Sequence, residues 1–189
     1  MQVSILGNSG SGKSTLARTL ADFCKARVLD LDTVAWEPGK IAVPRDPALA
    51  CRDIDQFIAE SKLNAWVVEG CYGNLVQHTL LHLPLLIFLD PGVEQCLSHC
   101  RSRPFEPHKY RTAEEQNSML PALLSWVQDY YTRSGEMSHQ DHLQRFELYA
   151  GPKVRLASTE EWLRSFASER FGDGAESQVG TADRADGRR

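Results

Sequence analysis

The chain has 189 residues, of which 21 are Lys or Arg and 25 are Asp or Glu, so its formal net charge is −4 at pH 7. Hydrophobic residues make up 42% and charged residues 24%, a balance that excludes a wholly disordered or fibrous chain. The length is typical of a single domain, and the acidic charge makes binding to nucleic acid through an overall basic field unfavourable.

Five short apolar runs alternate with helical patterns, which favours strand–helix–strand units and a parallel sheet. The runs are rich in Val, Ile and Leu without alternation, as in strands buried on both faces. They predict strands over Gln2–Leu6, Arg27–Leu31, Ala65–Glu69, Pro84–Asp90 and Lys153–Ala157. Helical spacing of apolar residues predicts helices over Lys13–Cys24, Asp46–Ser61 and Gly92–Ser102, with Asp90 as a candidate cap of the last.

Two further helices are predicted from capping boxes, in which a hydroxyl residue is followed three positions later by Glu. Thr112 with Glu115 opens a helix in which Pro121 should cause a kink or a restart. The predicted apolar face of this helix comprises Met119, Leu120, Leu123, Leu124, Val127, Tyr130 and Tyr131. Ser158 with Glu161 opens the other, whose inward residues are Trp162, Leu163 and Phe166.

The composition changes at the carboxyl end of the chain. Residues 171–189 consist mainly of Gly, Ala, Ser, Asp and Arg after Phe171, which predicts a disordered tail. We therefore expect one domain over residues 1–170.

No segment predicts export or insertion into a membrane. The longest apolar run, Leu80–Leu89, contains His82 and Pro84 and is shorter than the ~20 residues that a membrane span needs. Met1–Leu6 has neither a basic region nor a small-residue cleavage site, both of which a secretory signal requires. We expect a cytoplasmic protein.

A glycine-rich loop between the first predicted strand and helix carries the clearest chemical signal. Residues 7–14 match GxxxxGK[ST], in which glycines let successive backbone N–H groups face a phosphate. Lys13 can reach the β- and γ-phosphates, and the hydroxyl of Ser14 can bind Mg²⁺. A helix that starts at the loop adds the positive end of its dipole. The predicted nucleotide-binding residues are Gly7, Asn8, Ser9, Gly10, Ser11, Gly12, Lys13, Ser14 and Thr15.

Carboxylates follow two other predicted strands. Asp30 and Asp32 end the second strand and Glu69 ends the third, at the sheet edge where open parallel sheets bind ligands. Asp30 and Asp32 are two residues apart, so in an extended chain they would point to the same side. One carboxylate near Mg²⁺ can hold a coordinated water, and one near an acceptor hydroxyl can orient it or take its proton. The alternative is that they cap the turns that follow.

A basic segment lies between two predicted helices. Arg101, Arg103, Lys109 and Arg111 are balanced only by Glu106, and two prolines make the segment a loop. Arginines that close over a phosphoryl group in transfer stabilise its charge, so residues 101–112 form a candidate lid. A solvated basic loop or an RNA contact is the alternative. Arg133, at the end of the next helix, could also return to the site.

These motifs together resemble the small P-loop kinases, the superfamily of adenylate, shikimate and gluconate kinases. The stretches Leu31-Asp32-Thr-Val-Ala-Trp36-Glu-Pro38-Gly39, Trp66-Val-Val-Glu69-Gly70-Cys-Tyr72-Gly73 and Ile87-Phe-Leu-Asp90-Pro91 are most similar to the kinase-like DNA topology modulation proteins. The resemblance implies an α/β P-loop NTPase fold: a three-layer, doubly wound, parallel sheet of five strands in the order 2-3-1-4-5, with a lid. Residues 33–64 would be the acceptor-binding segment.

The resemblance also assigns roles to residues. It implies an ATP-dependent phosphotransferase that uses Mg²⁺, held by Ser14 with Asp30 or Glu69, and acts on a small-molecule hydroxyl or phosphate. Lys13 and Asp32 would act on the reacting groups, with Arg101 and Arg103 closing from the lid. We expect a monomer or homodimer. Two alternatives stay open: a regulatory or nucleic-acid-associated ATPase without small-molecule kinase activity, and a plain NTPase that uses water.

Overall fold

The computed structural model describes residues 1–37, 43–61, 65–106, 110–158 and 160, and every structural statement below concerns these residues. The chain divides into two compact units, residues 1–159 and 160–189. The predicted Ser158-capped helix, with Trp162, Leu163 and Phe166, and the predicted tail over residues 171–189 lie outside the described residues.

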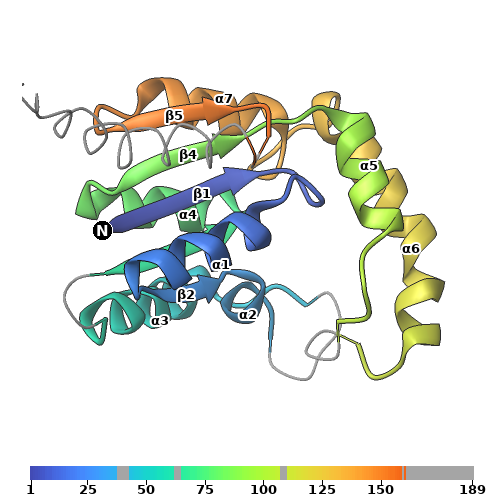
Figure 1. Ribbon diagram of the computed structural model, residues 1–189, viewed down its shortest axis with the longest axis horizontal. Coiled ribbons are helices and arrows are strands. Elements are labelled where there is room, and N and C mark those ends of the chain that lie inside the picture. The colour runs from blue at the N-terminus through green and yellow to red at the C-terminus, as the bar shows by residue number, and fades with distance from the viewer. Residues whose placement is uncertain (38–42, 62–64, 107–109, 159, 161–189) are drawn as a thin grey trace, which may run out of the picture. The chain divides into compact units, whose positions relative to one another are not determined.

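A parallel sheet of five strands forms the centre of the first unit (Figure 1). The strands are β1 (Gln2–Gly7), β2 (Arg27–Asp30), β3 (Trp66–Gly70), β4 (Leu85–Leu89) and β5 (Lys153–Leu156). Their order is β2-β3-β1-β4-β5, and each neighbouring pair is parallel. The α/β fold and the expected strand order are confirmed.

The three central strands match the prediction of burial on both faces, and the edge strands do not. All five residues of β3 are buried, and so are the last five of β1. At one edge, Arg27 and Val28 of β2 are exposed, and at the other β5 buries only Leu156 fully. Edge strands have one neighbour, so part of their surface stays in contact with water.

Helices lie on both sides of the sheet, as a three-layer fold requires (Figure 1). Helix α1 packs against β1, β2 and β3, α4 against β1 and β3, and α7 against β4 and β1. A buried hydrogen bond of 2.6 Å joins Ser4 of β1 to Thr79 of α4. The α-helices are α1 (Lys13–Cys24), α2 (Asp32–Ala35), α3 (Pro47–Ala59), α4 (Gly73–Thr79), α5 (Val93–Arg101), α6 (Ala113–Gln128) and α7 (His139–Leu148). No helix in the described part of the chain is long and apolar enough to cross a membrane.

Helix α6 begins as predicted and continues through Pro121 to Gln128. The hydroxyl of Thr112 accepts a 3.1 Å hydrogen bond from the backbone N–H of Glu115. Pro121 lies inside one continuous helix, so the predicted restart is wrong. Proline removes the bond to the Asn117 carbonyl, but both residues are exposed, so water can satisfy that oxygen. Of the predicted apolar face, Val127 is the one residue within α6 that is fully buried.

Asp90 does not cap α5, contrary to the sequence prediction. The helix is preceded by Gly92, and no side chain caps it. The carboxylate of Asp90 instead accepts hydrogen bonds from Tyr131 at 2.5 Å, His139 at 3.1 Å and Arg155 at 2.5 Å. Burial would raise the pKa of Asp90, but these three hydrogen bonds outweigh it and the pKa is lowered. Asp90 therefore ties the end of β4 to β5 and α7.

Asp90→Asn should lower the free energy of unfolding by about 1–3 kcal/mol at pH 7. The amide oxygen accepts fewer hydrogen bonds than a carboxylate, and the amide NH₂ group would face side chains that are themselves donors. Urea unfolding measures the change. Since the pKa of Asp90 is lowered in the folded protein, the difference should shrink as the pH falls below ~4. Asp22→Asn, at an exposed position of α1, is the control. Equal midpoints for the wild type and Asp90→Asn would contradict the role of this carboxylate.

Candidate functional site

The predicted phosphate-binding loop connects β1 to α1, as its sequence pattern requires. Gly10 and Gly12 have φ angles of 76° and 99°, a left-handed conformation that glycine adopts without steric cost. The Asn8 side chain holds the loop from within: its oxygen accepts from the Ser9 N–H at 2.8 Å, and its amide donates to the Val127 carbonyl at 3.1 Å. The loop is therefore shaped by contacts within itself and with α6.

Gly10 also lets the loop approach α5 closely. A Cβ atom at Gly10 would contact the Cys96 carbonyl oxygen and lie 2.7 Å from the Cys100 sulfur. On the same side, His99 Nδ1 is 2.8 Å from the Gly10 carbonyl oxygen. The helix that precedes the candidate lid is thus packed directly on the phosphate-binding loop.

Gly10→Ala should lower the free energy of unfolding by roughly 1–3 kcal/mol and weaken nucleotide binding, because the new methyl group is strained at positive φ and displaces α5. Urea unfolding and titration calorimetry with Mg·ATP measure the two effects. Gly135→Ala is a matched control: Gly135 also has a positive φ, of 95°, but nothing lies within 4 Å of its Cβ position. A loss in Gly10→Ala no larger than the loss in Gly135→Ala would contradict the steric argument.

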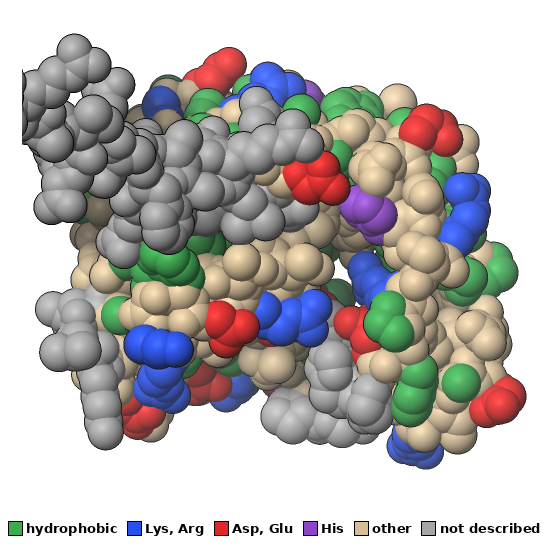
Figure 2. Space-filling model, viewed as in Figure 1, with side chains coloured by type: hydrophobic (Ala, Val, Ile, Leu, Met, Phe, Trp, Pro, Cys, Tyr) green, Lys and Arg blue, Asp and Glu red, His purple; other side chains and the backbone are tan. Residues whose placement is uncertain are grey.

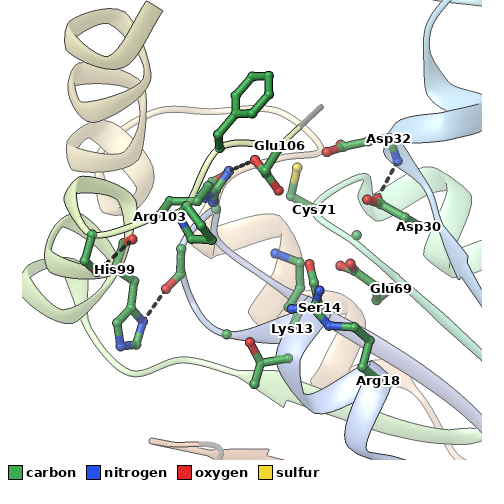
Figure 3. Close-up of a pocket in the computed structure, with 18 residues that line it drawn as sticks. Lys13, Ser14, Arg18, Asp30, Asp32, Glu69, Cys71, His99, Arg103 and Glu106 are labelled. Atoms are coloured by element: carbon green, nitrogen blue, oxygen red, sulfur yellow. Dashed lines mark hydrogen bonds and ion pairs between the residues drawn. The ribbon is translucent and has the colours of Figure 1, made fainter. Parts of the chain in front are cut away.

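The loop forms one wall of a cavity of about 540 Å³ (Figure 3). Carboxylates from the ends of β2 and β3 and the segment after α5 form the other walls. In the space-filling view, basic and acidic side chains lie close together between the sheet and helices α5 and α6 (Figure 2). The predicted site residues on the cavity wall are Ser9, Gly10, Gly12, Lys13, Ser14, Thr15, Asp30, Asp32, Glu69 and Arg103.

Asp30 and Glu69 are neighbours because the strands that carry them are paired. In the register of β2 and β3, Asp30 lies opposite Glu69. The assumption that Asp30 and Asp32 lie on one extended strand is wrong, because β2 ends at Asp30 and Leu31 has helical angles, φ −64° and ψ −18°. Asp30 Oδ1 accepts from the Asp32 N–H at 2.9 Å and so supports this turn. Both carboxylates nevertheless line the cavity.

Glu69 is buried, and its surroundings favour the neutral, protonated form of its carboxyl group. Its exposed fraction is 3%. Burial raises the pKa of Glu69, Asp30 and Asp32 add to the rise, and Lys13 and a hydrogen bond with Ser14 oppose it. Lys13 is itself buried, and its Nζ donates to the Asn8 carbonyl at 2.8 Å. A buried carboxylate and a buried ammonium therefore face one another beside the phosphate-binding loop (Figure 3).

The donor atoms at this point fit a magnesium ion. Oxygen atoms of Ser14, Asp30 and Glu69 meet at the cavity, and Mg²⁺ prefers oxygen ligands and usually keeps several waters and substrate phosphates in its shell. Among the described residues, no group of three or more His, Cys, Asp or Glu could hold a metal ion. An ion here would therefore depend on phosphate and water for the rest of its ligands.

The basic segment contributes one arginine to the cavity. Arg103 lines it and forms an ion pair of 3.1 Å with Glu106. Arg101, in the last turn of α5, is exposed and is not on the cavity wall. Lys109 lies outside the described residues. The structure therefore brings Arg103 to the loop and leaves Arg101 apart from it.

Arg133 does not reach the cavity. Its guanidinium donates to the carbonyls of Trp126 and Met137 and lies 3.5 Å from the centre of the Trp126 ring. Burial lowers the pKa of Arg133. This arginine joins the end of α6 to the turn before α7.

Several residues of the cavity were not predicted. Arg18 lies one helical turn after Ser14 on α1, so the i, i+4 spacing was a usable signal. His99 and Cys71 also line the wall. Burial raises the pKa of Cys71 to about 12, which keeps its thiol protonated at neutral pH. No local pattern marked His99 or Cys71, because their positions depend on how α5 and the end of β3 pack.

Comparison with known proteins finds similar solved structures at low sequence identity. A gluconokinase from Sinorhizobium meliloti 1021 is 17% identical, with a TM-score of 0.48 over 92% of this chain and 97% of that one. A sugar kinase from Janibacter sp. HTCC2649 is 16% identical, with a TM-score of 0.48 over 92% and 94%. A shikimate kinase from Aquifex aeolicus vf5 is 14% identical, with a TM-score of 0.47 over 91% and 99%.

No family model matches the chain, and no curated protein matches it. The resemblance to the DNA topology modulation proteins therefore stays a prediction.

Proposed function

We propose that the protein is a phosphotransferase that moves the γ-phosphoryl group of Mg·ATP to a hydroxyl or phosphate of a small molecule. One observation carries the proposal: the phosphate-binding loop, three carboxylates that end or follow two neighbouring strands, and Arg103 line a single cavity. A loop alone supports nucleotide binding. Carboxylates on the wall of the same cavity can also accept a hydrogen bond or a proton from a second reactant.

The phosphate chain of ATP binds to the backbone amides of residues 8–15, and Lys13 neutralises charge on the γ-phosphoryl group. Ser14, with Asp30 or Glu69, would hold Mg²⁺, which would supply positive charge to the phosphate groups. Arg103 adds positive charge from the lid side of the cavity, where its ion pair with Glu106 orients it.

Asp32 positions the second reactant. Its carboxylate accepts a hydrogen bond from the acceptor hydroxyl and takes its proton as the acceptor oxygen bonds to the γ-phosphorus. The bond between that phosphorus and the β–γ bridging oxygen breaks, and ADP leaves with the bonding electrons. A phosphate acceptor is mostly dianionic at neutral pH, since its second pKa is about 6, so Asp32 would then act by orientation.

The proposal includes the cellular setting expected from the sequence: a cytoplasmic enzyme, acting as a monomer or homodimer on ATP and a small molecule. Nucleic acid is not a partner in this proposal, because the chain is acidic overall and its basic segment is short. Binding to nucleic acid would weaken steeply with added salt, whereas phosphorylation of a small acceptor would tolerate it.

The test has two steps. Titration calorimetry with ATP or GTP, with and without Mg²⁺, measures whether the loop binds a nucleotide, and we expect Mg·ATP to bind. ADP formation is then measured with a panel of polyols, sugar acids, nucleosides and nucleoside monophosphates. A rate above background with one class supports the proposal. ADP formation that no acceptor increases favours the regulatory ATPase or the plain NTPase, and absence of nucleotide binding refutes all three.

A further inference from the structure

Trp36 and Tyr72 meet behind Asp32, although they come from different parts of the chain. Trp36 follows α2 and Tyr72 follows β3, immediately before α4. Their rings are 6.0 Å apart, centre to centre, with an edge-to-face angle of 75°. Tyr72 is 6% exposed and is not on the wall of the cavity. Neither aromatic residue is on the cavity wall, so Tyr72 contacts Asp32, and Trp36 contacts Tyr72, outside the cavity.

A chain of short hydrogen bonds connects the three side chains. Trp36 Nε1 donates to the Tyr72 hydroxyl oxygen at 2.7 Å, and the Tyr72 hydroxyl donates to Asp32 Oδ1 at 2.6 Å. The direction is determined by the indole, which can only donate. Because the indole N–H occupies the Tyr72 oxygen, the tyrosine proton is directed to Asp32. Asp32 must therefore present an acceptor oxygen at this contact.

We propose that Trp36 and Tyr72 are positioning residues that hold the Asp32 carboxylate in the orientation needed for phosphoryl transfer. The inference rests on the function proposed above, because it takes Asp32 as the group that orients the acceptor. A carboxylate on a two-torsion side chain loses rate when its direction is left free, since a misplacement of 1 Å can cost about 100-fold. The relay from Trp36 through Tyr72 restricts that freedom.

The environment keeps the relay in one protonation state. Burial raises the pKa of Tyr72, and the neighbouring Cys71 and Asp32 raise it further. The tyrosine therefore keeps its proton and remains a donor at neutral pH.

Tyr72→Phe should lower kcat by about 10–100-fold with the KM for ATP within about twofold of the wild type, using the most active acceptor of the panel. Trp36→Phe, which leaves the Tyr72 hydroxyl in place, should lower kcat by only about threefold. In an Asp32→Asn background, Tyr72→Phe should cause no further loss. An unchanged kcat in Tyr72→Phe overturns the inference.

Tyr149→Phe is the matched control. Tyr149 is also buried, and its hydroxyl donates to the Pro84 carbonyl at 2.6 Å, so the substitution removes one comparable hydrogen bond outside the site. It should lower stability about as much as Tyr72→Phe and leave kcat unchanged. Equal losses of kcat in the two variants would mean that stability alone explains the effect, and would overturn the inference.

A second measurement needs no acceptor and so separates this inference from the proposed function. In free protein, the indole N–H resonance of Trp36, assigned by its loss in Trp36→Phe, should move upfield in Tyr72→Phe. The unfolding constants of Tyr72→Phe and Asp32→Ala, which removes the acceptor oxygen, should also differ from multiplicative behaviour by about fivefold or more in the double variant. An unmoved resonance or multiplicative constants overturn the relay, whether or not an acceptor is found.

Discussion

Replacing Lys13 by alanine should lower the rate of phosphoryl transfer by ~1000-fold or more while leaving the protein folded. Charge stabilisation in a water-excluded site is usually the largest single contribution to such a reaction, and Lys13 is the buried cation of the loop. Its Nζ contacts the Asn8 carbonyl within the loop, so the charge is held where the phosphates bind. Steady-state ADP formation with the most active acceptor measures the loss.

Circular dichroism and urea unfolding of Lys13→Ala check that the fold is retained. The matched control is Lys153→Ala, which removes an exposed lysine at the amino end of β5, the end of the sheet away from the cavity. It should leave the rate within about twofold, as surface changes away from a site usually do. A folded Lys13→Ala protein that transfers phosphate at the wild-type rate would refute the proposed function.

Lowering the pH from 7 to 4 should reduce the free energy of unfolding by about 3 kcal/mol through His142 alone. His142 is fully buried, and its ring contacts the Tyr130 hydroxyl at 2.7 Å and the Cys71 carbonyl at 2.9 Å. Burial lowers the pKa of His142 to about 4 from an ordinary value of 6.5. The carbonyl must accept, so Nε2 carries the proton and Nδ1 accepts from Tyr130.

The sign follows from proton binding. Below pH 6.5 the unfolded chain binds a proton at His142 that the folded protein does not bind until about pH 4. Stability from the neutral buried imidazole is therefore complete above pH 6.5, falls between 6.5 and 4, and is lost below that. Because Cys71 lines the cavity, acid should also loosen the end of β3 at the site.

His142→Gln isolates this effect, because glutamine can donate to Cys71 and accept from Tyr130 without titrating. Urea unfolding measures the free energy of unfolding at each pH between 7 and 4. Over this range it should fall by about 3 kcal/mol less in His142→Gln than in the wild type. Parallel curves for the wild type and His142→Gln would show that His142 binds its proton equally in the folded and unfolded states, and would contradict the lowered pKa.

The strands could be predicted closely, and some of the helices could not. Each observed strand begins and ends within one residue of its prediction, because apolar runs bounded by turn residues are a local signal. Helices α4 (Gly73–Thr79) and α7 (His139–Leu148) were not predicted. Helix α4 has seven residues and begins without a side-chain cap, so it has too few turns to show a period. Helix α7 is mostly polar and buries only His142.

The sequence predicted many residues of the candidate site but not the hydrogen bonds that hold them. The loop residues and the carboxylates Asp30, Asp32 and Glu69 do line one cavity, since parallel strands bring their carboxyl ends to one edge. The wrong prediction for Asp90 has the same origin as the missed role of Tyr72. Each side chain is explained by a partner that is distant in sequence, 41 residues away for Asp90 with Tyr131 and 40 for Asp32 with Tyr72.

By itself, the sequence determined that the chain has a phosphate-binding loop between a strand and a helix, acids at two strand ends and a basic segment beyond. Those features depend on neighbouring residues, whose geometry is set by backbone angles and periodicity. Only the tertiary structure decided which charge meets which: Arg103 at the cavity and Arg133 on Trp126, and Asp32 on Tyr72. Hydrogen bonds and ion pairs act over a few ångströms, so their partners are chosen by packing and not by spacing along the chain.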